Sequence, residues 1–201
     1  MGRKQVKPIM QPDDTTCGPA SIKHALHVLG IRKSLQSLVQ LCKTNRNGTS
    51  TKNMINAITK LGLSVMAVEN ATLKHLQSAL KYPPAKPRAA LVSYLYDLNE
   101  KDEPHIESGH WAVVASFLSS TSRIVLLDSA SGKRKSYNWV DFRTRWFDYD
   151  YKRRKVAKRG KKFRLVKSWQ PQLLLIIAKT PDALPKFRIS TAHVFTPSAF
   201  A

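Results

Sequence analysis

The sequence predicts an α+β fold in which a mostly helical first half precedes an antiparallel β-sheet. Between residues 18 and 61, apolar residues recur at intervals of three and four, the period of amphipathic helices. From about residue 88 onward, short apolar runs alternate with turn residues, which is typical of strands. With 201 residues, the chain is most simply one domain and is long enough to bury a hydrophobic core.

The first predicted helix is described below together with its cysteine. Two short helices are predicted after it. Ser34 is suited to the N-cap of a helix that covers residues 34–41 and carries one apolar face. A polar turn follows at residues 45–50, where Thr49 or Ser50 can cap a third helix that ends at a glycine.

The hydrophobic period then changes from that of helices to that of strands. Residues 63–68 and 88–96 are predicted strands. A helix from about 71 to 80 and a proline-rich connection at 82–87 separate them.

Residues 110–117 and 122–127 predict a β-hairpin, since two apolar runs flank a short polar turn. Antiparallel pairing would bring His110, at the start of the first strand, and Asp128, at the end of the second, to the same edge of the sheet. The elements expected after this hairpin are a strand at 133–137, a short helix at 139–147 and an apolar strand at 173–178.

Cys17 stands at the mouth of the first predicted helix, residues 18–30. Pro19 fits the first turn, where the N–H that proline lacks would be unpaired, and Gly30 is a plausible stop. A helix N-terminus carries partial positive charge and free N–H groups, which favour a thiolate over a thiol. Gly18 leaves the approach of a carbonyl group unobstructed. Cys17 is therefore a candidate nucleophile.

Gln11 lies six residues before the cysteine on a segment expected to be extended, because a residue that precedes a proline avoids the helical region. A side-chain amide held there could donate a hydrogen bond to an oxyanion, with the backbone N–H of Cys17 as the second donor.

The pattern Gln-x5-Cys-Gly-x-Ala at residues 11–20 resembles the papain-like cysteine peptidases, and most of all the C39 group of double-glycine leader peptidases and their free-standing relatives. In that family the order is Gln, Cys, His, Asp. Residues 109–114 read Gly-His-Trp-Ala-Val-Val, and residues 123–129 read Arg-Ile-Val-Leu-Leu-Asp-Ser, so the order and the context both match. The similarity covers roughly residues 8–180, with gaps at two inserts.

The resemblance implies a papain-like fold and a cysteine peptidase that requires no metal or cofactor. Its substrate would be a peptide or protein, and a double-glycine leader is the substrate class expected of the family. The site residues implied are Cys17 as nucleophile, His110 as base, Asp128 as the carboxylate that orients the base, and Gln11 as oxyanion donor. Thr16 departs from the acidic residue that many members have at this position.

Two of these residues also have a simpler structural interpretation. His110 could be an ordinary histidine at a sheet edge, and Asp128 could be a turn residue, a role that is compatible with catalysis. His105, in the acidic loop at residues 97–108, is the other candidate base, but it lies in a polar loop rather than at the start of a strand.

No sequence pattern indicates a function for the remaining pair of histidines or for the second cysteine. His24 and His27 are three residues apart on the first helix, but no matching pair of ligands follows, so we expect ordinary histidines on the surface or flank rather than metal ligands. Cys42 lies beside apolar neighbours, which predicts a buried, unreactive thiol.

The charge is unusual, because 34 basic and 13 acidic residues give a net charge of +21. Residues 151–169 contain ten basic residues and no acidic one, and they predict a basic surface loop or hairpin. Interleaved aromatic residues there could stack on bases, so nucleic acid or another polyanion is a candidate partner. The residues that would bind it are Lys152, Arg153, Arg154, Lys155, Lys158, Arg159, Lys161, Lys162 and Arg164.

The domain prediction is a single C39-like domain at residues 1–180, with a basic insert at about 151–168, followed by a loosely packed tail at 181–201. No run of eighteen apolar residues and no secretory h-region are found, so we expect a cytoplasmic protein without a membrane span.

Two other function classes remain open from the sequence. The first is a catalytically weak binding module on the same scaffold that uses its basic surface. The second is a deamidase or transpeptidase that uses the same thioester chemistry, since the acceptor that resolves the thioester decides the outcome.

Overall fold

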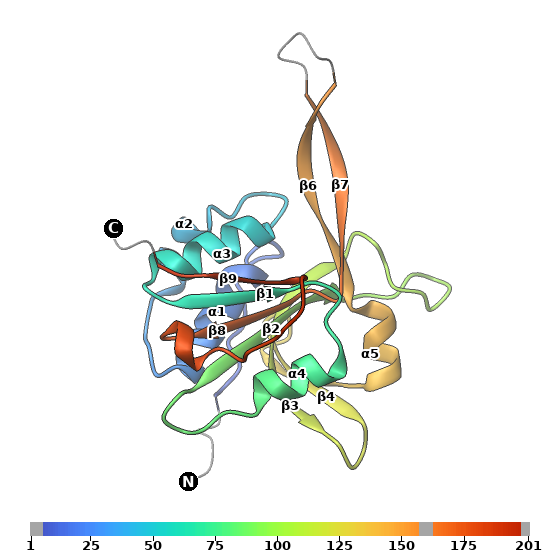
Figure 1. Cartoon of the computed structure of the whole chain (residues 1–201). Coiled ribbons are helices and arrows are strands. Elements are labelled where there is room, and N and C mark those ends of the chain that lie inside the picture. The colour runs from blue at the N-terminus through green and yellow to red at the C-terminus, as the bar shows by residue number, and fades with distance from the viewer. Residues whose placement is uncertain (1–5, 157–162, 198–201) are drawn as a thin grey trace.

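The computed structural model describes residues 6–156 and 163–197 (Figure 1). The predicted order of elements is confirmed in its main lines. The helices are α1 (Cys17–Val28), α2 (Leu35–Cys42), α3 (Thr51–Lys60), α4 (Leu73–Leu80) and α5 (Trp139–Arg145), with a short 3-10 helix at Pro181–Ala183. The strands are β1 (Ser64–Val68), β2 (Arg88–Leu95), β3 (Gly109–Leu118), β4 (Arg123–Asp128), β5 (Lys133–Asn138), β6 (Phe147–Lys155), β7 (Phe163–Pro171), β8 (Leu174–Ala178) and β9 (Ala192–Phe195).

One sheet of seven strands forms the centre of the molecule, in the order β5-β4-β3-β2-β8-β1-β9. All neighbouring strands are antiparallel. Helices cover both faces. The first core lies between the sheet and α1, α2 and α3, and the second lies between the sheet and α4 and α5. Because β1 and β8 are buried on both faces, their sequences are apolar at every position except Ser64 rather than alternating.

The helix caps follow the sequence signals. The side chain of Ser34 accepts a hydrogen bond from the backbone N–H of Ser37, and that of Ser50 accepts one from Asn53. Each satisfies an N–H group that the helix itself leaves unpaired at its first turn.

The predicted hairpin of β3 and β4 is confirmed. Val113 pairs with Leu127 and Val114 with Leu126, and a bulge shifts the register near Ser116. The start of β3 and the end of β4 therefore meet at one edge of the sheet, as the antiparallel arrangement predicted.

The C-terminal segment differs from its prediction. We expected a loosely packed tail from residue 181, but β9 pairs with β1 and extends the central sheet by one edge strand. Ala183 and Leu184 are buried in the second core. Because this pairing depends on β1, about 125 residues earlier in the chain, no local sequence pattern announces it.

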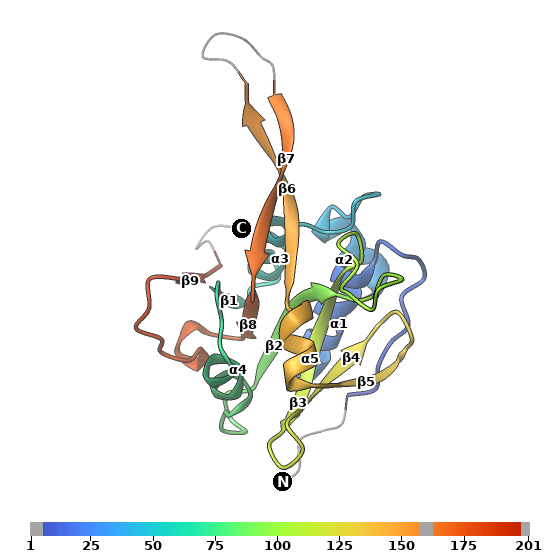
Figure 2. The same cartoon turned by 90° about the vertical axis from the view of Figure 1, so that its right-hand side faces the viewer.

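Strands β6 and β7 form a separate two-stranded ribbon that projects from the body of the molecule (Figures 1 and 2). Phe147 pairs with Pro171 at the root and Lys155 with Phe163 at the far end of the described part. In its described part, the basic segment therefore forms the two paired strands of a hairpin, one of the two predicted forms. The helix expected at 139–147 ends at Arg145, since β6 already begins at Phe147.

In the described part of the chain, no helix combines the length and the apolar character needed to span a membrane.

Candidate active site

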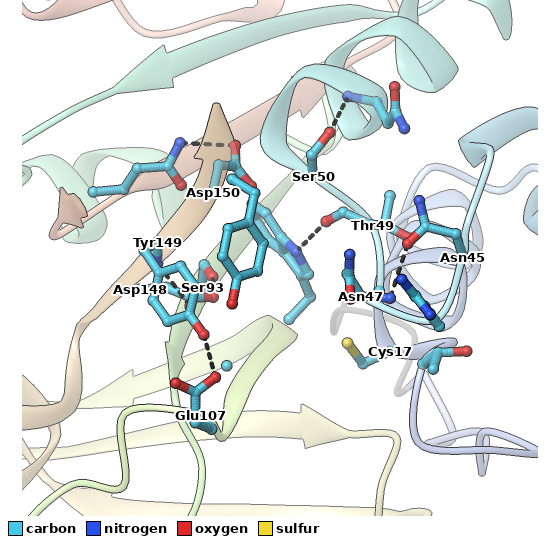
Figure 3. Close-up of a pocket in the computed structure, with 18 of the residues that line it drawn as sticks. Cys17, Asn45, Asn47, Thr49, Ser50, Ser93, Glu107, Asp148, Tyr149 and Asp150 are labelled. Atoms are coloured by element: carbon cyan, nitrogen blue, oxygen red, sulfur yellow. Dashed lines mark hydrogen bonds between the residues drawn. The ribbon is translucent and has the colours of Figure 1, made fainter. Parts of the chain in front are cut away.

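Cys17 is the first residue of α1, as the sequence predicted. Cys17 is only 6% exposed, and its side chain lines a cleft with a volume of about 630 Å³. Figure 3 shows the sulfur between the loop that carries Asn45, Asn47 and Thr49 and the side chains of Glu107 and Asp148. The first turn of a helix presents free N–H groups, so the oxygen of a bound carbonyl would meet backbone donors here.

Gly18 is required for a reason that differs from the predicted one. A Cβ atom at Gly18 would lie 2.8 Å from the Cβ of Thr49 and 3.1 Å from the sulfur of Met54. The glycine thus allows the loop before α3 to pack directly against α1. The indole N–H of Trp111 donates to the carbonyl of Thr49 and fixes the same loop from the sheet side.

His110 and Asp128 are brought together by the hairpin. The Nε2 atom of His110 lies 3.1 Å from Oδ1 of Asp128, and both residues are buried. Burial alone would lower the pKa of His110, but the Asp128 carboxylate and the neighbouring Cys17 thiol outweigh it and raise that pKa to about 9. His110 is therefore in contact with both Cys17 and Asp128.

Asp128 has a second role, in the turn after β4. Its carboxylate accepts hydrogen bonds from the backbone N–H groups of Ala130 and Ser131 and from the hydroxyl of Ser131. Burial raises the pKa of the carboxyl, but His110, Ser131 and Tyr96 together hold it well below its usual range. The turn role that the sequence suggested and the contact with His110 are thus both present.

Gln11 is held beside this turn. Its backbone N–H donates to the carbonyl of Ser129, and its side-chain oxygen accepts a hydrogen bond from the Ser129 hydroxyl. The side-chain amide donates one hydrogen to the carbonyl of Asp13 at 2.7 Å. A primary amide carries two hydrogens, so one remains for a ligand. Gln11 is not among the residues that line the cleft.

The opposite wall of the cleft carries two aspartates of β6. Asp148 accepts hydrogen bonds from the Ser93 hydroxyl and from the backbone N–H of Tyr149, and its carboxyl group is packed among protein atoms. Burial raises its pKa to about 6. Asp150 accepts from the backbone N–H of Thr51, at the start of α3, and burial raises its pKa as well. Both aspartates also anchor the ribbon to the body.

Tyr96 and Asp148 are two residues of the site that sequence reasoning missed. Tyr96 donates to Asp128, and its ring centroid lies 4.9 Å from that of His110. Its position depends on the pairing of β2 with β3, which no local signal reveals. For Asp148 a signal existed, because Phe-Asp-Tyr-Asp-Tyr at residues 147–151 alternates as a strand does.

The alternative candidates occupy other positions. His105 is exposed in its loop, and the contact with Asp128 is made by His110. His24 was expected at the surface, but it is fully buried, and its Nε2 accepts a hydrogen bond from the backbone N–H of Ile9. Burial lowers the pKa of His24 to about 4, which keeps it neutral in that role. Within the described residues, no cluster of His, Cys, Asp and Glu is arranged to hold a metal ion.

Cys42 is fully buried, as predicted, and burial raises the pKa of its thiol to about 12. A thiol with such a pKa stays protonated at neutral pH and is therefore a poor nucleophile.

The residues predicted to bind a polyanion belong to the ribbon. Lys152, Arg153, Arg154 and Lys155 lie on β6 and Arg164 lies on β7, whereas Lys158, Arg159, Lys161 and Lys162 lie outside the described residues. Polyanion binding by this set stays a prediction.

Two solved structures share the fold. One is the peptidase domain of Streptococcus ComA, a bifunctional ABC transporter involved in a quorum-sensing pathway, with a TM-score of 0.61, 19% identity and coverage of 88% of this chain and 100% of that one. The other is a double glycine motif protease from an AMS/PCAT transporter in complex with the leader peptide, with a TM-score of 0.58, 16% identity and coverage of 89% and 95%. At these identities the two structures establish a papain-like fold.

A search of curated protein sequences found no match. The model of the peptidase C39 family matches residues 5–149, which include all four predicted site residues. With nearly three quarters of its length inside this match and a fold of the same kind, the chain belongs to the peptidase C39 family.

Proposed function

We propose that this protein is a cysteine peptidase in which Cys17 is the nucleophile, His110 the general base and acid, and Asp128 the residue that orients the imidazole. The observation that carries the proposal is the position of His110, which is buried, 3.1 Å from Asp128 and in contact with the Cys17 thiol. Membership of the C39 family and the position of Cys17 in the cleft support the same roles.

The first half of the reaction forms a thioester. Since Nε2 of His110 faces Asp128, Nδ1 is the ring nitrogen left for the thiol, and it takes the proton of Cys17. The thiolate attacks the peptide carbonyl carbon, a C–S bond forms, and the carbonyl π electrons move to the oxygen. When the tetrahedral intermediate collapses, the C–N bond breaks and the imidazolium of His110 protonates the leaving amine.

The second half regenerates the enzyme. His110 accepts a proton from water, the resulting hydroxide attacks the thioester, and the C–S bond breaks to release the carboxylic acid and the Cys17 thiolate. In both halves, negative charge develops on the carbonyl oxygen. The donors we assign to it are the backbone N–H of Cys17 and the second amide hydrogen of Gln11, and loss of one such donor typically costs about 3 kcal/mol of transition-state stabilisation.

A peptide with a double-glycine leader is the substrate class that we propose. The support is the family, together with the similar fold of a double glycine motif protease that was solved with a leader peptide. Glycine at the scissile bond also suits a nucleophile that is only 6% exposed, because a larger side chain would need more room beside the sulfur.

The test is the pH dependence of Cys17 alkylation by iodoacetamide, measured in a Cys42→Ala background and in the same background with His110→Ala. We expect rapid labelling that persists below pH 7 and that is lost when His110 is replaced, because the imidazolium maintains the thiolate. His105→Ala is the matched control and should label as the parent does. Labelling that rises only at alkaline pH in all three proteins would contradict the proposal.

A further inference from the structure

The ribbon of β6 and β7 presents a row of exposed aromatic and aliphatic side chains on one of its two faces. Directly paired residues lie on the same face of an antiparallel ribbon, and every second residue along a strand does so too. Tyr149 pairs with Trp169 and Tyr151 with Lys167. We name this surface the aromatic face, and its members are Tyr149, Tyr151, Phe163, Leu165 and Trp169.

Most of the aromatic face is open to solvent. Phe163 is 55% exposed, Leu165 62% and Trp169 50%, although a globular protein gains by burying such side chains. At its root the face is ordered, since the ring centroids of Tyr149 and Trp169 are 5.3 Å apart and the two rings meet edge to face. An ordered, uncovered row of this kind is suited to receive apolar side chains of a partner.

Beyond its root, where Glu107 accepts hydrogen bonds from Tyr149 and Lys167, the charge around the aromatic face is positive. Lys152, Arg154 and Arg164 are exposed, and residues 151–169 include no acidic residue. A ribbon is only two strands wide, so long basic side chains from the opposite face reach its edges. A partner that complements this surface therefore combines acidic and apolar side chains.

The aromatic face is continuous with the cleft that contains Cys17. Tyr149, Tyr151 and Leu165 line this cleft and also belong to the aromatic face. Strand β6 has nine residues, which at about 3.3 Å per residue gives a ribbon of roughly 30 Å. A peptide with its scissile bond at Cys17 can thus continue along the ribbon for several residues.

We propose that the aromatic face of the ribbon binds a segment of the peptide substrate that carries acidic and apolar side chains and lies several residues from the scissile bond. This inference rests on the proposed peptidase function and adds the recognition of its substrate. The cleft itself is lined by the carboxylates of Asp14, Glu107, Asp148 and Asp150, which outnumber the basic residue Arg46. These carboxylates disfavour acidic substrate residues near the scissile bond, and they equally disfavour a phosphate backbone that would run from the ribbon into the cleft.

The experiment measures binding rather than cleavage, with the full chain carrying Cys17→Ala. A library of fluorescent peptides of about 15 residues, long enough to span cleft and ribbon, varies independently in acidic, basic, apolar and neutral polar content. We expect peptides that are both acidic and apolar to bind best at about 0.15 M salt. The double variant Phe163→Ser with Leu165→Ser should bind these peptides roughly tenfold or more weakly, as loss of central apolar contacts does.

Matched variants and nucleic acids complete the design. Leu118→Ser with Val140→Ser removes two apolar side chains outside the ribbon that are 45% and 63% exposed, and it should leave binding unchanged. The inference is overturned if the library shows no preference for acidic, apolar peptides, or if the ribbon pair behaves like this control. It is also overturned if single-stranded RNA or DNA of similar length binds more tightly than the peptides and loses affinity in the ribbon variant.

The result is separable from that of the alkylation test. Binding to the Cys17→Ala protein needs no nucleophile, so a failure of the ribbon inference leaves the proposed peptidase standing. Conversely, a failure of the alkylation test removes the proposed chemistry and leaves a peptide-binding ribbon.

Discussion

The hydroxyl of Tyr96 donates a hydrogen bond of 3.0 Å to Oδ2 of Asp128, the carboxylate oxygen that does not face His110. Tyr96 thereby holds the carboxylate from the position directly after β2, while its ring lies against the ring of His110. The orientation of Asp128 is thus supported by a residue from outside the turn that follows β4.

We predict that Tyr96→Phe weakens the fold and slows the reaction moderately. The ring stays against His110, but Asp128 loses a donor, which costs about 1 kcal/mol. If transition-state stabilisation falls by the same free energy, kcat/KM falls roughly fivefold. Chemical denaturation and the cleavage rate of a leader peptide measure the two effects. A variant with unchanged stability would show that this hydrogen bond does not hold the carboxylate.

The two roles of Asp128 can be separated by comparing Asp128→Asn with Asp128→Ala. Asparagine keeps an acceptor for the N–H of Ala130, but its NH2 group replaces Oδ2, which accepts from the N–H of Ser131, and it removes the charge that faces His110. We expect both variants to lose on the order of 10²–10⁴ in kcat. Both should lose stability in the turn, and alanine should lose about 1–3 kcal/mol more, because it also leaves the N–H of Ala130 unsatisfied. Equal stability of the two variants would argue against a structural role in the turn.

Much of this arrangement could be predicted from the sequence, because it is local. The two apolar runs within residues 110–128 and the polar turn between them predict a hairpin, and antiparallel geometry alone then brings His110 to Asp128. Pro19 and Gly30 similarly define the helix that Cys17 opens. Local signals succeed here because the hydrogen bonds that they describe join residues that are near in sequence.

The parts that were missed depend on contacts between distant segments. Tyr96 meets Asp128 only after β2 pairs with β3, and β9 joins the sheet only once β1 is in place. The burial of His24 depends on the N-terminal segment, whose Ile9 donates to it. In each case, a distant segment of the chain pairs with a hydrogen-bonding group or a strand edge that the neighbouring residues leave unpaired.

The pH dependence of stability should reveal the ion pair of His110. The pKa of His110 in the folded protein is about 9, above its ordinary value of 6.5. The stability contributed by the protonated ring is therefore complete below pH 6.5 and is lost as the pH rises through 9. Asp128, with its lowered pKa, contributes stability that is complete above about pH 4 and lost below it.

The measurement is the free energy of unfolding of wild type and His110→Gln between pH 5.5 and pH 9.5. We expect the advantage of wild type to shrink over this range by on the order of 3 kcal/mol, since each pKa unit corresponds to about 1.4 kcal/mol. His105→Gln, at an exposed position, should follow the wild-type curve. A constant difference between wild type and His110→Gln would show that the folded imidazole titrates as it does in the unfolded chain.

Asp148 should have the opposite effect from Asp128, because burial raises its pKa from 3.8 to about 6. Ionising this carboxyl is easier in the unfolded chain, so the fold loses stability as the pH rises from about 4 to 6 and then stays at the lower level. Asp148→Asn keeps an acceptor for Ser93 and removes the charge. We therefore expect this variant to gain stability over wild type across that range, reaching on the order of 2 kcal/mol at pH 7.

Urea denaturation at several pH values between 4 and 7.5 tests the sign as well as the size of this effect. Asp182→Asn is the matched control, because the Lys86 ammonium lowers the pKa of Asp182, and its replacement should cost stability above pH 4 rather than add any. If Asp148→Asn destabilised the protein equally at all pH values, the carboxylate would be a required hydrogen-bond acceptor rather than a buried charge. In that case the attachment of β6 to Ser93 would depend on both carboxylate oxygens, and the ribbon would be held to the body by Asp148 itself.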